Sequence, residues 1–388
     1  MNKRKCKHLC KLLFIAAMLG LFLLPLRPQS QNQSLKSFDP APDWRPTHAP
    51  ANASYVGNAT CAECHNEVTT QPTTPMGIAL ETAATSRILT QHKELTFKNG
   101  ALSYSIRRNG EQSIYSVTDG KESLSVPVLY VFGQGKAGQT YVLEHNGKLL
   151  ESRISFFNAT GGLDFTMGAS RAVPNSLEAA LGRVLDAKSI KDCFSCHATA
   201  AISQGQLQLD KMNLGVTCEG CHGAGEKHVS LMKMKPKDGV TGRQGDKAIL
   251  NPGHFDTEGQ AQFCGACHRS WIQVQTMGVR GVENVRFQPY RIFNSKCYDY
   301  KDKRISCTAC HNPHEEIKSD KAFYDAKCLA CHQPEKQAAK TQTKIVVCPK
   351  AKQDCVSCHM PKTEIPGIHF KFTDHQIRVV RAGEPYPN

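Results

Sequence analysis

The chain has 388 residues, among them 18 cysteines and 16 histidines, and a formal net charge of +14 at pH 7. A charge of this size ordinarily indicates an anionic partner such as nucleic acid. Six of the positive charges lie in the first 27 residues, which contain no acidic residue, so +8 remains for the rest of the chain. The net charge is therefore no argument for nucleic-acid binding.

The N-terminus has the pattern of an export signal. Basic residues between Lys3 and Lys11 precede an apolar run over 12–24, which is short for a membrane span. We interpret residues 1–27 as a Sec-type signal peptide. Because no small-residue cleavage site follows the apolar run, an uncleaved N-terminal membrane anchor is the alternative. Residues 28–53 are rich in Pro, Gln, Ser and Asn, which predicts a flexible tether.

Residues 54–91 hold the first of seven repeats in which two cysteines, separated by two residues, are followed directly by histidine. The repeats are Cys61, Cys64 and His65; Cys193, Cys196 and His197; Cys218, Cys221 and His222; Cys264, Cys267 and His268; Cys307, Cys310 and His311; Cys328, Cys331 and His332; and Cys355, Cys358 and His359. In c-type haem attachment both thiols add to porphyrin vinyl groups, and the imidazole becomes an axial ligand of iron. The sequence therefore predicts seven covalently attached haem c groups with their iron.

Zinc and redox-active dithiols are the alternatives for paired cysteines. A zinc site needs two such pairs per ion and does not require histidine at the very next position, whereas every pair here has it. Haem also bears on the charge, because its propionates would offset the positive charge that remains. We therefore expect no nucleic-acid partner.

The distal ligand of the first haem is open. Met76 follows His65 in Thr-Thr-Pro-Met-Gly, just ahead of an expected helical stretch over 78–89, and its thioether could reach iron or could simply fill the core. His92 and His48 are the competing ligands.

Residues 92–165 carry a different pattern. Four pairs predict hairpin turns, Asn99-Gly100, Asn109-Gly110, Asp119-Gly120 and Asn146-Gly147, and alternating apolar residues flank them. We expect a small antiparallel β module that docks a partner, covers the first haem or is purely structural.

The second haem-binding region follows, over 166–272 with motifs two to four and 273–388 with motifs five to seven. Asn175 and Glu178 form a plausible capping pair for a helix whose apolar face runs from Leu177 to Leu185. Segments between motifs are too short for cores of their own, so the porphyrins must supply the apolar body. We therefore expect a mostly α and irregular multihaem cytochrome c fold organised around covalent haems, with a small antiparallel β insert.

Histidines outside the motifs nearly match the number of irons that need a second axial ligand. The candidates for the distal position, besides Met76, are His228, His254, His314, His369 and His375. Cys297 and Cys348 belong to no motif, and in an oxidising compartment they could form a disulfide or remain as buried thiols.

Several segments resemble the multihaem cytochromes c of the c-552/4 type, which are related to the tetrahaem cytochrome that takes electrons from hydroxylamine oxidoreductase. The similarity runs through 55–60, the Cys-Glu-Gly-Cys-His-Gly-Ala-Gly run at 218–225, the Cys-Thr-Ala-Cys-His-Asn-Pro-His run at 307–314 and the ending at 355–375. The resemblance implies that His228, His314 and His375 are distal ligands. The chain departs from the family pattern at Met76, where a Ser-x-His-Ala segment would be usual.

These patterns predict an exported electron-transfer protein, periplasmic or extracellular or held at the inner membrane, that carries electrons along closely packed haems between redox partner proteins. No residue is expected to be catalytic in the bond-making sense. One alternative is an oxidoreductase of small nitrogen or sulfur compounds with one open haem site. Another is a polymerising cytochrome, a homo-oligomer in which a spare histidine binds a neighbouring subunit's haem.

Overall fold

The computed structural model describes residues 54–234, 246–332 and 348–388. The expected signal or anchor at 1–27, the expected tether at 28–53 and the candidate ligand His48 lie outside these residues. Within the described ranges, no helix is both long and apolar enough to cross a membrane.

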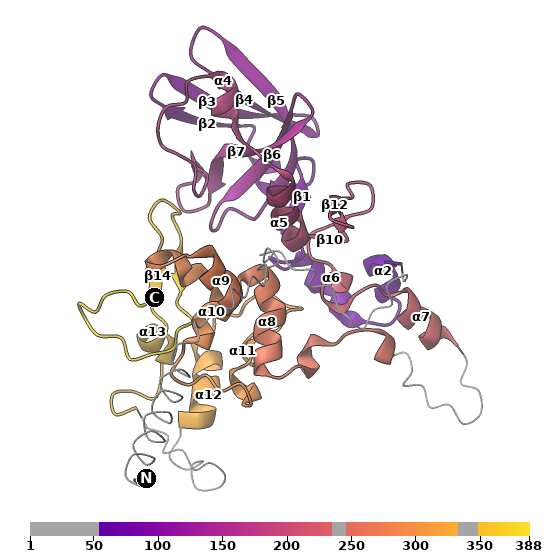
Figure 1. Cartoon of the computed structure of the whole chain (residues 1–388), viewed down its shortest axis with the longest axis vertical. Coiled ribbons are helices and arrows are strands. Elements are labelled where there is room, and N and C mark those ends of the chain that lie inside the picture. The colour runs from indigo at the N-terminus through magenta and orange to yellow at the C-terminus, as the bar shows by residue number, and fades with distance from the viewer. Residues whose placement is uncertain (1–53, 235–245, 333–347) are drawn as a thin grey trace, which may run out of the picture. The chain divides into compact units, whose positions relative to one another are not determined.

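An antiparallel sheet of nine strands is the largest element of the fold (Figure 1). Strands β2 to β8 pair in sequence order, while β1 pairs with β5 and β9 with β7. The strands are β1 (Leu80–Thr82), β2 (Glu94–Asn99), β3 (Leu102–Asn109), β4 (Gln112–Thr118), β5 (Ser123–Phe132), β6 (Gln139–His145), β7 (Lys148–Phe157), β8 (Gly162–Phe165) and β9 (Gly182–Val184). Phe97 of β2 packs edge-on against Phe165 of β8 with ring centroids 5.2 Å apart, so the two ends of the strand path approach each other.

All four predicted hairpins are present, but Asn99 and Asn109 are the last paired residues of their strands, and Asn146-Gly147 is the predicted pair that forms a two-residue loop. Asn99 pairs with Leu102, Asn109 with Gln112 and His145 with Lys148, so a two-residue loop closes each of these hairpins. The fourth turn joins Thr118 to Ser123 and contains Asp119-Gly120. Asn146 and Gly147 have φ values of 52° and 70°, the left-handed backbone that a type I′ turn requires.

Alternation of apolar and polar side chains builds the core of the sheet. Along β4 and its neighbour β3, every second side chain is buried, and Tyr104 and Tyr115 pack edge to face. Ala180 and Leu181 of α4 (Leu177–Leu181) complete this cluster. The core therefore forms from the chain's own residues and does not depend on a cofactor.

The expectation of a mostly α and irregular fold with a small β insert is wrong. Helix accounts for 34% and strand for 24% of the structure. The 92–165 stretch alone forms the seven strands β2 to β8, and β1 and β9, which lie outside it, enlarge the sheet further. Each of these two strands spans three residues, too short for a periodic signal, and each is held by a strand distant in sequence.

Two local helix predictions are also corrected. The expected helix over 78–89 is replaced by β1 and by α3 (Arg87–Gln91). The helix expected through Leu185 ends at Leu181, and its N-cap is Ser176 and not Asn175. Gly182 explains the end, because a Cβ there would lie 2.0 Å from the Glu151 carbonyl oxygen at a φ of 153°. Glycine thus lets the chain leave the helix and pair with β7.

Motifs two to seven lie on helices, with His311 as the C-cap of its helix, and motif one begins at Cys61, the last residue of its helix. The motif helices are α2 (Gly57–Cys61), α5 (Ala187–His197), α6 (Cys218–His222), α8 (Thr257–His268), α11 (Cys307–Cys310), α12 (Lys321–His332) and α13 (Cys355–His359). The other helices are α3, α4, α7 (Glu226–Lys233), α9 (Trp271–Met277) and α10 (Gln288–Phe293). Short strand pairs join β10 (Ala198–Thr199) to β13 (Asn213–Leu214), β11 (Ile202–Ser203) to β12 (Gln206–Leu207) and β14 (Lys362–Glu364) to β15 (Lys371–Thr373).

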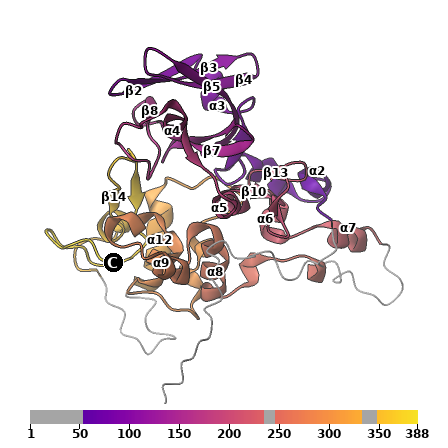
Figure 2. The same ribbon diagram turned by 45° about the horizontal axis from the view of Figure 1, so that its top comes forward.

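The sheet supports the second motif. Figures 1 and 2 both place α5 between the sheet and α8. Phe132 at the end of β5 packs against Phe194 of α5 and against the His197 ring, with centroid distances of 5.3 and 4.9 Å. The β module therefore contacts the second motif directly, a role that the sequence pattern did not indicate.

Candidate haem sites

Three motif histidines face a histidine from outside the motifs. His65 lies opposite His228, with ring centroids 6.2 Å apart. His222 lies opposite His314 at 6.0 Å, with the rings nearly parallel. His311 lies opposite His375 at 6.1 Å. We call these three the facing pairs.

The spacing of the facing pairs fits a metal bound between two imidazoles. Two rings that each bond one metal through a nitrogen about 2 Å away have centroids about 6 Å apart. The three observed distances agree with that separation to within a few tenths of an ångström. His65, His222 and His311 would hold haem iron from the motif side, with His228, His314 and His375 on the distal side.

Hydrogen bonds orient several of these rings. The Nδ1 atoms of His197, His222 and His359 lie 3.0, 2.6 and 2.9 Å from the carbonyl oxygens of Ala79, Leu250 and Arg378. On the distal side, Nδ1 of His375 lies 3.0 Å from the Thr373 carbonyl oxygen. A carbonyl that accepts a proton from Nδ1 leaves the Nε2 lone pair available for a metal. Burial lowers the pKa of His197, His222 and His375, which favours the neutral ring that binds iron.

Cysteines from different motifs meet in four places. A hydrogen bond with Cys218 raises the pKa of Cys61, and the same contact lowers the pKa of Cys218 to about 7. Equivalent hydrogen bonds join Cys196 to Cys267, Cys264 to Cys307 and Cys328 to Cys355. Motif one is therefore beside motif three, motif two beside four, four beside five, and six beside seven.

Electrostatic interactions between cysteines indicate two further pairs of neighbouring motifs. The pKa values of Cys264 and Cys267 are raised first by the hydrogen bonds just described and by burial. The charge of Cys221 raises both pKa values further, so the third motif lies near the fourth. Burial raises the pKa of Cys328 and Cys310 raises it further, so the fifth motif lies near the sixth. The motifs thus form one unbroken series, one, three, four, five, six and seven, with motif two beside motif four.

Buried polar side chains join neighbouring motif helices, and the sequence reasoning missed them. The Glu219 carboxylate, inside motif three, accepts hydrogen bonds from the backbone N–H groups of Val56, Gly57 and Gly225 at 2.7 to 2.8 Å. Val56 and Gly57 begin the helix of motif one, so this carboxylate holds motifs one and three together.

The same device recurs at two other junctions. The Asp325 carboxylate on α12 accepts from the backbone N–H groups of Asp354 and Cys355 at 2.6 and 2.8 Å, where the helix of motif seven begins. Gln260 on α8 accepts from the backbone N–H of Thr308 in motif five at 3.1 Å. A polar residue within or shortly before a motif is the signal that could have suggested these contacts.

The His375 ligand candidate is held by a buried ion pair. Asp374 and Arg291 have completely buried side chains, and Nε and an Nη of Arg291 donate to the two carboxylate oxygens at 2.8 and 2.9 Å. Arg378 donates to the same carboxylate at 2.6 Å. The backbone next to His375 is therefore fixed from two sides.

The other predicted ligands lie elsewhere. His369 is hydrogen-bonded to Asp164 at 2.7 Å and packs on Phe157, and His254 is exposed beside Asn251. His92 packs on Phe156 of the sheet. The backbone carbonyl of Met76 accepts from Val216, just before motif three. Cys297 and Cys348 are both exposed and are not joined to each other.

The donor set fits haem better than a directly bound ion. Over the part of the chain that the structure describes, no group of three or more His, Cys, Asp or Glu side chains could hold a metal ion. The zinc alternative therefore finds no ready site among these residues, whereas the facing pairs match an iron that brings its own equatorial ligands.

Glu219 gives a direct test of the contact between motifs one and three. Glu219→Ala should lower the free energy of unfolding of the holoprotein by about 3 kcal/mol, because it leaves buried N–H groups without acceptors. Urea titration measures this change. Glu226→Ala is the matched control, since Glu226 is exposed and accepts one hydrogen bond, from Ser54; its loss should stay below about 0.5 kcal/mol. Equal losses in the two variants would contradict the role of Glu219.

Comparison with known proteins adds one match. Residues 168–223, which include motifs two and three, match the family model described as cytochrome c554 and c-prime. No curated protein and no solved structure matches the chain. The family match supports a c-type cytochrome with covalently bound haem c and a part in electron transfer.

Proposed function

We propose that this c-type cytochrome is an exported seven-haem protein of the c-552/4 type, which transfers electrons between redox partners along a chain of closely packed haems. The observations that carry the proposal are the three facing pairs and the contacts that place motif one beside three, two beside four, four beside five and six beside seven. Bound haem would supply iron that takes up and releases one electron at a time.

The protein's own residues would set the path. Each facing pair would give one iron two histidine ligands, which would keep that iron low-spin and leave it no position for a substrate. Glu219, Gln260 and Asp325 fix the spacing of neighbouring motifs through hydrogen bonds to backbone groups. Because these contacts are short and partly buried, the distances between sites would change little during electron transfer.

The alternative of an open site at the first haem receives less support. His228 lies opposite His65, so a distal ligand is already at hand there. Neither Met76 nor His92 is needed for that position. We therefore place electron transfer above reduction or oxidation of small nitrogen or sulfur compounds.

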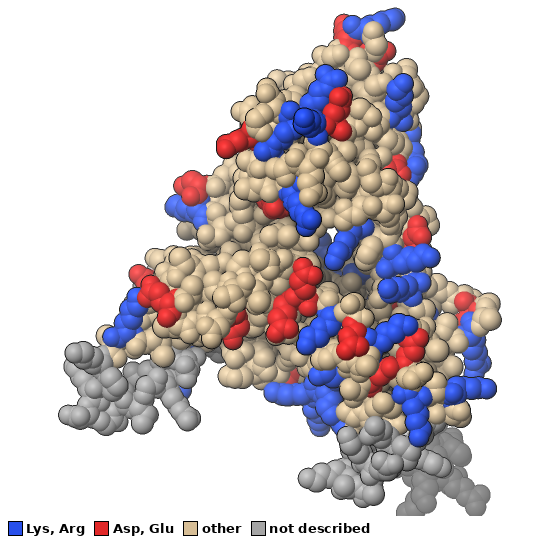
Figure 3. All heavy atoms as spheres, turned by 180° about the vertical axis from the view of Figure 1, so that it is seen from behind, with Lys and Arg blue, Asp and Glu red and all other residues tan. Residues whose placement is uncertain are grey.

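Partners and location are also part of the proposal. On the face drawn in Figure 3, Lys and Arg side chains have Asp and Glu side chains among them, an arrangement that suits protein partners better than a nucleic acid. We propose donor and acceptor proteins in the periplasm or outside the cell. Fractionation of cells that express the full chain, with and without residues 1–27, tests export and anchoring.

Spectroscopy of the purified holoprotein tests the proposed function. We expect seven covalent haems per chain by mass spectrometry, and low-spin iron at the facing pairs by EPR and magnetic circular dichroism. Single replacements of His228, His314 and His375 by alanine should each convert one haem to high-spin. Fewer than seven covalent haems, or wild-type iron that is largely high-spin, would count against the proposal.

A further inference from the structure

We propose that Met277 is the second axial ligand of the iron at His268, and that this haem therefore has a higher reduction potential than the haems of the facing pairs. This inference rests on the proposed function, since it concerns one of the seven haems. It assigns a ligand to the fourth motif, for which the sequence pattern offered none.

His268 differs from the motif histidines of the facing pairs. Those three each have a second imidazole at 6.0 to 6.2 Å. Across residues 54–234, 246–332 and 348–388, no ring contact joins His268 to a histidine outside the motifs. The histidines that act on it electrostatically, after burial, are His197 and His311, which belong to motifs two and five.

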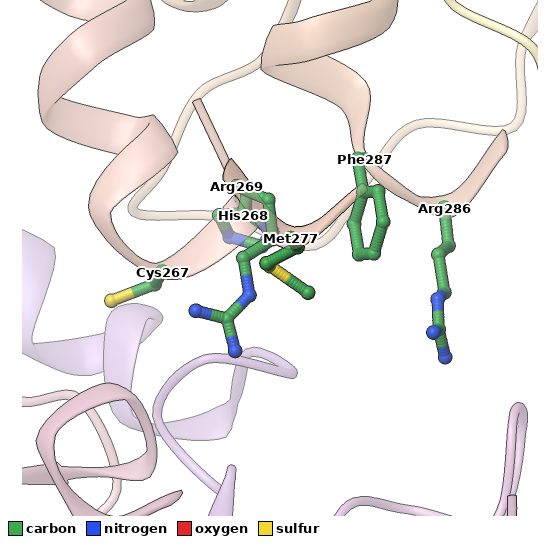
Figure 4. Close-up of a pocket in the computed structure, with 6 residues that line it drawn as sticks. All are labelled: Cys267, His268, Arg269, Met277, Arg286 and Phe287. Atoms are coloured by element: carbon green, nitrogen blue, oxygen red, sulfur yellow. The ribbon is translucent and has the colours of Figure 1, made fainter. Parts of the chain in front are cut away.

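A pocket beside His268 contains a suitable donor. The pocket has a volume of about 250 Å³ and is lined by Cys267, His268, Arg269, Met277, Arg286 and Phe287. Figure 4 shows the Met277 thioether next to the His268 ring, with the guanidinium groups of Arg269 and Arg286 pointing into the opening. Guanidinium has no lone pair to give, phenylalanine has no donor atom, and Cys267 is committed to haem attachment. Met277 supplies the remaining atom of the lining that can bind iron.

The backbone holds Met277 at a fixed place relative to His268. Helix α8 ends at His268, and α9 begins three residues later behind a capping box of Ser270 and Gln273. The two helices meet tightly, because a Cβ on Gly265 would lie 2.7 Å from the Ser270 Cβ. Met277 ends α9, and Gly278 follows in the left-handed conformation.

Packing does not account for Met277. Its side chain is 41% exposed, whereas the core-facing residues of α9 are Gln273 and Val274. A methionine that only filled the core would be covered. Exposure into the pocket beside His268 is what a ligand position requires.

The fourth motif lies at a branch in the chain of motifs. This motif contacts motif two, where the Cys196 sulfur lies 3.8 Å from the Ala266 carbonyl oxygen, and motif five, where Gln260 accepts a hydrogen bond from Thr308. Histidine and methionine together raise the potential of haem iron above that of two histidines. The haem at His268 would therefore be the first to accept an electron and would collect electrons at the branch of the chain.

Substitution of Met277 in the full-length holoprotein tests the inference. The oxidised wild type should show the weak red band of sulfur-to-iron charge transfer, and Met277→Leu should remove it. Met277→His should also remove the band, leave the high-spin fraction as in the wild type and move one haem to lower potential in a redox titration. Met76→Leu and Met232→Leu are the matched controls and should leave the band and the titration unchanged.

The outcomes separate this inference from the proposed function. A wild type with seven haems and no red band, or a band that survives in Met277→Leu, overturns the ligand assignment and leaves electron transfer standing. A wild type with one high-spin haem that binds added nitrite overturns it in favour of an open site beside Arg269 and Arg286. If Met277→Leu loses haem, the redox titration of Met277→His tests the assignment in its place. A titration of Met277→His that is the same as that of the wild type overturns the assignment.

Discussion

Removal of the fourth haem should divide the electron-transfer chain. Cys264→Ala combined with Cys267→Ala prevents attachment at the motif that contacts motifs two and five and lies near motif three. The second haem would then lose its neighbour, and the third would reach the fifth only through the segment that carries His314, which faces His222. We expect electron flow through the protein to fall at least tenfold, which corresponds to a barrier higher by about 1.4 kcal/mol. Conductance of protein monolayers between electrodes measures it.

The control removes a haem from the end of the series. Cys355→Ala combined with Cys358→Ala deletes the seventh haem, which touches the sixth and leaves the rest of the series continuous. Both variants carry six haems, so a difference in conductance reports position and not number. Low-spin spectra for the six remaining haems would show that each variant is folded. Equal conductance in the two variants would contradict the branch position of motif four.

Asp374→Ala should have the largest effect on stability. The substitution leaves the buried Arg291 guanidinium without its carboxylate, and loss of one partner of a buried ion pair costs about 3–5 kcal/mol. Because Asp374 precedes His375, we also expect the haem at His311 to lose its distal ligand and become high-spin. Urea unfolding gives the first quantity and EPR the second.

The matched control for Asp374 is an exposed ion pair. Glu94 pairs with Arg107 at 2.9 Å on the surface of the sheet, so Glu94→Ala should cost less than about 1 kcal/mol and leave every spectrum unchanged. Asp374→Asn distinguishes charge from shape, since it keeps the size of the side chain. If Asp374→Ala is as stable as Glu94→Ala, or stays entirely low-spin, the ion pair does not position His375.

Much of the local structure was predictable. The turns follow from residues that tolerate positive φ, both residues at Asn146-Gly147 and the glycine alone at the other three, and the strands between them follow from alternation. The helices at the motifs begin and end close to the cysteines. The full size of the sheet was not predictable, because β1 and β9 are strands only through partners far away in the sequence.

The candidate ligands were also predictable only in part. The resemblance predicted that His228, His314 and His375 are ligands. It did not predict which motif histidine each of them faces. His228 follows motif three in sequence and lies against the histidine of motif one, because Glu219 brings the two motif helices together. His369 was also a candidate ligand, and Asp164 of the sheet holds it instead.

The sequence by itself determined the chemistry of this protein, since two cysteines and a histidine at fixed spacing carry their function in a single helical turn. The tertiary structure decided which motifs are neighbours, which histidines face one another and where Met277 lies. Those relations depend on buried side chains such as Glu219, Asp325 and Asp374, which bond to backbone or charged groups from distant parts of the chain. No local pattern encodes such contacts, because their partners are chosen by packing.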